Sequence, residues 1–135
     1  MFIQTAFRSA LFMILPVFFL ISCSDDSPAT GPVEDVSFSN DVQVILNQSC
    51  GGAGCHLESS QSGVNLSSYD QVMNSTGLQY EREIVEPGNP DASPLVDKIE
   101  PNPAFGERMP FGRNPLSDRE IEIIRVWIEE GALDN

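Results

Sequence analysis

Residues 50–56 read Cys-Gly-Gly-Ala-Gly-Cys-His, and this stretch decides how the rest of the chain is interpreted. It holds two of the three cysteines and the only histidine of the protein, and the four residues between the cysteines are all small. Glycine adopts backbone conformations that other residues avoid, so the segment between the two thiols is able to turn tightly. Two thiols and an imidazole held this close together require a chemical explanation.

One explanation is a covalent cofactor. A haem is attached when two thiols add to its vinyl groups and the imidazole directly after the second cysteine binds the iron. Cys55 and His56 supply that adjacent pair, although four residues separate the cysteines where the usual motif has two. A zinc site would need four ligands, usually Cys and His, and no third thiol or second imidazole remains if Cys23 carries the lipid that is predicted below. The remaining alternative is a Cys50–Cys55 disulfide loop with a surface histidine.

A second iron ligand would have to come from another part of the chain. Because His56 is the only histidine, ligation by two histidines is excluded within one chain. A methionine thioether favours reduced iron, and His/Met ligation raises the reduction potential. The candidates are Met109, in a Pro- and Gly-rich loop over 101–115, and Met73, on the apolar side of a predicted helix where methionine commonly fills the core.

The chain resembles small c-type cytochrome domains of bacterial envelopes whose expanded haem motif ends in Gly-Cys-His. The similarity spans nearly all of the sequence after the N-terminal segment. It is carried by Phe-Ser-Asn-Asp-Val-Gln (38–43), Gly-Val-Asn-Leu-Ser-Ser-Tyr (63–69), Pro-Gly-Asn-Pro-Asp-Ala-Ser (87–93), Arg-Met-Pro (108–110) and Trp-Ile-x-x-Gly-Ala (127–132). The resemblance implies a cytochrome c-like fold around one haem c, with Met109 as the sixth ligand to iron.

Three further side chains are candidates for contact with the haem. Arg108 and Arg113 flank the proposed ligand loop, and guanidinium groups pair well with carboxylates such as the haem propionates. Trp127 is a candidate to pack on the macrocycle or to donate a hydrogen bond. The alternative for each is an ordinary structural role, as a solvated arginine or a core tryptophan.

Hydrophobic periodicity predicts a mainly α fold, a single domain of about four short helices with long loops. A helix is expected over 38–47, with Ser39 or Asn40 as its N-cap, and a second over 66–74, begun by Ser67 or Ser68. A third is expected after the Ser93-Pro94 pair. The last helix begins at a capping box over 117–120. Residues 83–86 are at most a short extended piece. Such a small core is marginal unless something else fills its middle.

The N-terminal segment predicts export and a lipid anchor. After Arg8, an apolar run over 11–21 is short for a bilayer span and is typical of a signal peptide. Residues 20–23, Leu-Ile-Ser-Cys, resemble the lipobox of bacterial lipoproteins, which implies lipidation of Cys23. The alternatives are an ordinary signal peptide with a chance cysteine, or an uncleaved anchor helix.

These signals divide the chain into three parts. Residues 1–22 are the expected signal peptide. Residues 23–36 have almost no large apolar side chain and are expected to form a flexible acidic tether. Residues 37–135 are the expected haem domain. This organisation predicts a protein anchored by acyl chains in the cell envelope of a Gram-negative-type bacterium, facing the periplasm or displayed on the cell surface.

The composition limits the class of partner. The formal net charge is −13, and loss of Arg8 with the signal makes the remaining chain more negative still. No basic stripe exists to bind nucleic acid, so a charge-steered partner is expected to be basic, as a redox protein with a basic docking surface would be.

The expected function is one-electron transfer by the haem iron. No nucleophile with an adjacent base and no spare histidine is present, so we do not expect an enzyme. Two alternatives remain: a haem-based ligand sensor in which Met109 leaves the iron, and a haem-free structural lipoprotein with a Cys50–Cys55 disulfide.

Overall fold

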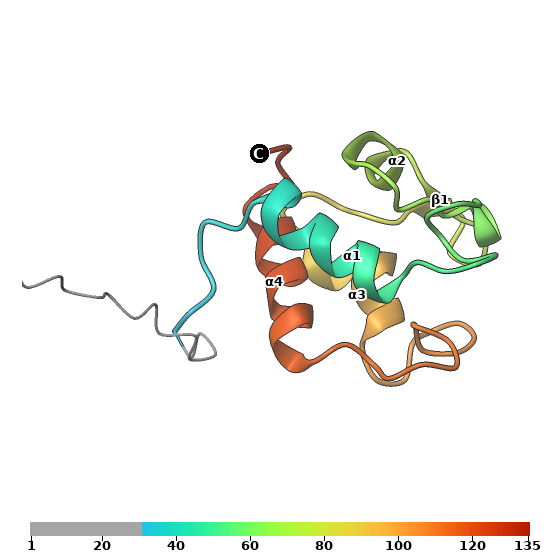
Figure 1. The fold of residues 1–135 in the computed structure, drawn as a ribbon. Helices are drawn as coiled ribbons and strands as arrows, with labels where there is room; N and C mark the ends of the chain where they lie inside the picture. Colours follow the sequence, from blue (N-terminus) through green and yellow to red (C-terminus); the bar gives the residue numbers. More distant parts are fainter. Residues whose placement is uncertain (1–30) are drawn as a thin grey trace, which may run out of the picture. The chain divides into compact units, whose positions relative to one another are not determined.

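A computed structural model describes residues 31–135, which form one compact unit (Figure 1). The described part contains four α-helices, three short helical turns of other types and a small two-stranded sheet, joined by long loops. The predicted signal peptide and the lipidation site Cys23 lie outside the described residues. No described helix is both long and apolar enough to cross a membrane.

The first helical segment starts as a π-helical turn, η1 (Phe38–Val42), and continues as α1 (Gln43–Ser49). The sequence predicts this helix, but its N-cap is Ser37 instead of Ser39 or Asn40. The Ser37 hydroxyl accepts a hydrogen bond from the Asn40 backbone N–H at 3.2 Å. Capping satisfies a backbone donor that the helix itself leaves without a partner.

The last helix, α4 (Asp118–Glu129), has the predicted capping box. The Ser117 hydroxyl accepts from the Glu120 backbone N–H, and the Glu120 carboxylate accepts from the Ser117 backbone N–H at 2.7 Å. Gly131 follows the helix with a φ of 103°, a conformation that favours glycine at a helix end.

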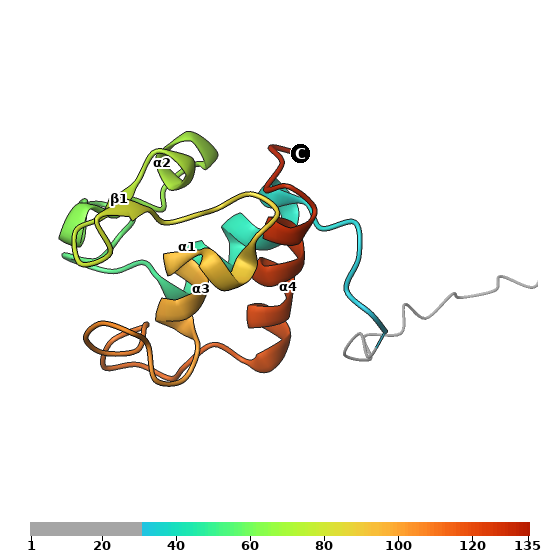
Figure 2. The same ribbon diagram turned by 180° about the vertical axis from the view of Figure 1, so that it is seen from behind.

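The middle of the chain contains shorter elements. Helix α2 (Tyr69–Met73) begins after Ser68, one of its two predicted caps, and α3 (Pro94–Ile99) follows Ser93 as predicted. The turns η2 (Gln61–Gly63) and η3 (Pro90–Ala92) precede them. Strand β1 (Thr76–Gly77) pairs antiparallel with β2 (Arg82–Glu83), Thr76 opposite Glu83. Figure 2 shows α3 beside α4, where the two helices pack together.

The core lies between η1, α1, α3 and α4. Trp127 is 1% exposed, and its indole ring packs against Phe38 with the ring centroids 5.3 Å apart. The C-terminus closes on the start of η1, because the Asn135 side chain accepts from the Phe38 backbone N–H at 2.8 Å (Figure 1). These contacts join the two ends of the domain.

The predicted boundary between tether and domain at residue 36 is wrong. Val36 is buried in the core, and Val33 packs against it. The backbone N–H groups of Asp35 and Val36 both donate to the Glu130 carboxylate, at 2.9 and 3.0 Å. The domain therefore begins before Val36, because apolar burial and two charge-assisted hydrogen bonds offset the entropy of ordering this segment.

Candidate functional site

The described residues enclose a cavity of about 460 Å³, a volume within the usual range for bound small molecules. Its walls come from the C-terminal end of α1 and the loop after it, the turn between β1 and β2, helix α3, and the loop before α4. The cavity brings together four residues that the sequence selects from two distant segments: Cys50, Cys55, His56 and Met109.

The two cysteines lie on one wall. Cys50 is the C-cap of α1, where its backbone N–H donates to the Leu46 carbonyl at 2.8 Å, and it is buried, whereas Cys55 is half-buried. Both are free thiols in the structure. Burial, with a smaller contribution from Cys55, raises the pKa of the Cys50 thiol to about 11, so this thiol is protonated at neutral pH.

The glycines between the cysteines are required by the backbone. Gly52 and Gly54 have φ angles of 132° and 79°, which other residues rarely adopt. A Cβ at Gly51 would lie 2.7 Å from the Leu57 side chain and 3.0 Å from the Asn47 carbonyl oxygen. The loop between the two thiols can therefore follow this path only because its residues are small.

The imidazole of His56 is oriented by the backbone. Its Nδ1 lies 3.2 Å from the Val64 carbonyl oxygen. Because a carbonyl only accepts hydrogen bonds, Nδ1 carries the proton in this contact, which in the neutral ring leaves the lone pair on Nε2. The His56 carbonyl in turn accepts from the Leu66 backbone N–H at 2.7 Å. A hydrogen bond of this kind fixes the tautomer of a metal-binding histidine.

Met109 reaches the cavity from the loop that follows α3. Its backbone N–H donates to the Lys98 carbonyl at 2.7 Å, and its half-buried side chain lines the cavity. Met73 instead packs against the hydrophobic core from α2 and is not part of the cavity lining. Of the two candidate methionines, only Met109 faces the cysteines and His56 across the same cavity.

The three weaker candidates occupy different places. Arg113 lines the cavity, and its Nη1 lies 3.5 Å from the Ser49 carbonyl oxygen. Arg108 is absent from the lining, because its Nε donates to the Ile99 carbonyl at 2.7 Å. Trp127 is a core residue whose Nε1 donates to the Leu133 carbonyl at 2.9 Å. Trp127 thus lies in the core and outside the cavity lining, and Arg108 attaches its loop to the end of α3.

Several lining residues are not apparent from sequence patterns, among them Leu78, Tyr80, Lys98 and Phe111. Leu78 and Phe111 are 67% and 70% exposed. The only signal that the sequence offers for these two residues is that they lie close to predicted motifs. Phe111, for example, lies two residues after Met109.

The charge of the cavity differs from that of the whole chain. The lining includes Lys98 and Arg113 but no aspartate or glutamate, although acidic residues outnumber basic ones in the protein, 20 to 7. Across residues 31–135, no group of three or more His, Cys, Asp and Glu side chains is arranged to hold a metal ion by itself. The cavity thus suits an apolar ligand that carries negative groups.

Comparison with known proteins does not add to this geometry. No family model, no curated protein and no solved structure matches the chain. A function must therefore be inferred from the residues of the cavity themselves.

Proposed function

We propose that the protein is a one-electron carrier with one covalently bound c-type haem, tethered to a bacterial envelope membrane through a lipid on Cys23. The observation that carries the proposal is the convergence of Cys50, Cys55, His56 and Met109 on one cavity. When bound, the haem supplies an iron that alternates between the ferrous and ferric states.

The donor set fits this group. Cys50 and Cys55 would hold it through thioether bonds, and His56 offers the free Nε2 lone pair that an iron ligand needs. Met109 would be the second axial ligand, and its soft thioether would raise the potential. Apolar walls that include Leu66, together with Val64, Ile84, Leu95 and Ile99, would keep water from the site.

The charges of the site fit as well. Arg113 would pair with a propionate group of the haem, because an arginine forms a paired hydrogen bond with a carboxylate. The positive charge of Lys98 beside the cavity would also favour the negative propionates. The acidic remainder of the surface would favour a basic redox partner, since opposite charges speed up encounter. No arrangement of an independent catalytic nucleophile and base is part of the proposal.

Intact-mass measurement tests the covalent attachment. The full chain, produced in a host that attaches c-type haem, is expected to carry one haem mass. Cys50→Ala and Cys55→Ala are each expected to lose one thioether bond, and the double variant is expected to lose the covalent haem entirely. A protein that has no haem and is lighter by two hydrogens would contain the Cys50–Cys55 disulfide, which contradicts the proposal.

Absorption spectroscopy tests the axial ligands. A low-spin haem with histidine and methionine ligands has a weak far-red band that disappears when the thioether is lost. Met109→Ala is expected to abolish this band and lower the reduction potential, whereas the matched control Met73→Ala should keep both. A wild-type protein that is high-spin, or that binds carbon monoxide readily, would favour a ligand-sensing role and contradict the assignment of Met109.

A further inference from the structure

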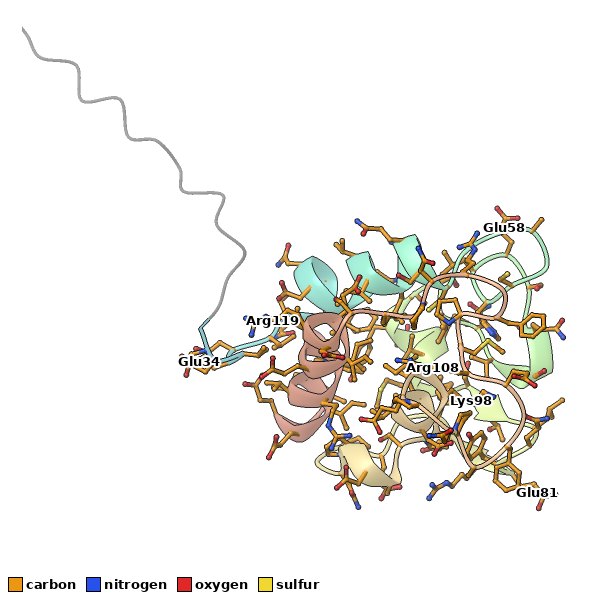
Figure 3. The ribbon with its side chains drawn as sticks, turned by 90° about the horizontal axis from the view of Figure 1, so that it is seen from below. Glu34, Glu58, Glu81, Lys98, Arg108 and Arg119 are labelled. Carbon is orange, nitrogen blue, oxygen red and sulfur yellow. The ribbon has the colours of Figure 1, made fainter. Side chains whose placement is uncertain are left out.

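The loop that carries Met109 is held by three consecutive residues at the end of α3. The Asp97 carboxylate accepts from the Ala104 backbone N–H at 2.9 Å. The Lys98 carbonyl accepts from the Met109 backbone N–H at 2.7 Å, and the Ile99 carbonyl accepts from Arg108 Nε at 2.7 Å. Figure 3 shows Lys98 and Arg108 near each other on this part of the molecule.

The side chain of Lys98 adds a second attachment. Its Nζ donates to the backbone carbonyls of Phe105 and Glu107, at 2.8 and 2.6 Å. Gly106, between them, has a φ of 62° and lets the two carbonyls turn toward the same ammonium group. Hydrogen bonds from a charged donor are stronger than those between neutral groups. Lys98 is also the only lysine of the chain.

Apolar burial contributes little to the position of this loop. Phe105 is 48% exposed and Phe111 is 70% exposed, on either side of Met109. Tyr80 packs edge-on against Phe105, with ring centroids 5.0 Å apart, and its hydroxyl donates to Asp97. With so little buried apolar surface, the hydrogen bonds to α3 determine where the loop lies.

We propose that Lys98 is the positioning residue that keeps the Met109 thioether in the cavity. This inference rests on the proposed function, in which Met109 is the axial ligand. Without the ammonium group, the carbonyls of Phe105 and Glu107 lose their shared donor, and the loop keeps only the hydrogen bonds of Ala104, Arg108 and Met109 to α3. The segment between Ala104 and Arg108 then becomes more mobile, and the thioether of the neighbouring Met109 stays in the cavity for a smaller fraction of the time, so external ligands would reach a bound iron more readily.

Three variants of the full, haem-loaded chain test this role. Lys98→Ala removes the ammonium group, and Lys98→Arg keeps a cation that is able to reach both carbonyls. Arg119→Ala is the matched control, because it removes a cation from α4 whose hydrogen bonds go to Glu122 and Gly31, away from the loop (Figure 3). Each variant is examined by intact mass, far-red absorption, carbon monoxide binding and amide hydrogen exchange.

We expect all three variants to keep the covalent haem mass. Lys98→Ala should lose more than half of the far-red band, bind carbon monoxide, and show at least about tenfold faster exchange of the amides in residues 104–109. Lys98→Arg should restore most of the band and of the protection, and Arg119→Ala should resemble the wild type. The reduction potential is a poorer readout, because removal of any cation beside the cavity shifts it.

The outcomes separate the two proposals. If Lys98→Ala keeps the far-red band and the slow amide exchange of the Arg119→Ala control, the positioning role of Lys98 is wrong, but the proposed haem binding is not contradicted. If Lys98→Ala loses its covalent haem together with the band, Lys98 acts on folding and the positioning role is again wrong. If the wild type carries no covalent haem, the proposed function fails, and this inference fails with it.

Discussion

The two halves of the described domain are stabilised in different ways. In the helical half, side chains from α1 and α4 pack almost without exposure, as Leu46, Ile124 and Trp127 do, and the chain ends are joined through Asn135. The cavity half consists mainly of loops, and Leu78 and Phe111 are largely exposed there. Backbone hydrogen bonds and special glycines, more than packing, set its shape.

This difference indicates which half depends more on a ligand. Side chains of the helical half pack against one another, whereas several apolar side chains of the cavity half face the cavity itself. A small domain with such a cavity gains stability when a ligand fills it. The proposed haem would complete the half that the polypeptide leaves incomplete.

Truncation of the central side chain of the helical half should have the largest effect. We expect Trp127→Ala to lower the free energy of unfolding by about 3–5 kcal/mol, because it leaves a large cavity in the core. Both halves should unfold together in a urea titration followed by circular dichroism, since the cavity half has no separate core. A loss below about 1 kcal/mol would mean that the helical half is not the source of stability.

Removal of the covalent attachment should affect mainly the cavity half. In the Cys50→Ala/Cys55→Ala double variant, we expect at least about tenfold faster amide exchange over residues 51–64 and 104–113, equivalent to about 1.4 kcal/mol of local stability. Amides in α1 and α4 should change much less. Equal acceleration in both halves would contradict the distinction between them.

Loss of the capping box should weaken the helical half at one end. We expect Ser117→Ala to cost about 1 kcal/mol, because the Glu120 backbone N–H loses its acceptor and the Glu120 carboxylate loses a donor. Ser60→Ala is the control, since Ser60 makes no side-chain cap at the start of η2. The melting temperature of Ser117→Ala should be lower than that of Ser60→Ala. Equal melting temperatures would show that the capping box does not contribute to stability.

The smallest effect is expected from Tyr80→Phe, and it should depend on pH. Burial, followed by the hydrogen bond to Asp97, raises the pKa of Tyr80 above its ordinary value of 10.0. The protonated hydroxyl therefore stabilises the fold fully below pH 10, by less than about 1 kcal/mol, and this contribution declines as the pH rises further. Wild type and variant should differ in urea at pH 8 and converge above pH 10; a constant difference would exclude this origin.

The sequence by itself determined the local features. The capping box at Ser117, the cap at Ser68 and the helical periodicity of α4 depend on residues within a few positions of one another, so they can be recognised without a structure. The same holds for residues 50–56, where the spacing of two thiols and one imidazole is itself the signal. The start of the first helical segment differed from its prediction, because Ser37 caps η1 in place of Ser39 or Asn40.

Only the tertiary structure decided which distant residues share the cavity. It places Met109 in the cavity lining and leaves Met73 in the core. It also brings Trp127 into a hydrogen bond with the Leu133 carbonyl, and Lys98 into hydrogen bonds with the loop. It also draws Val36 into the domain. These outcomes depend on contacts between segments far apart in the chain, where burial and hydrogen-bond partners are set by the packing of the whole domain and leave no local pattern in the sequence.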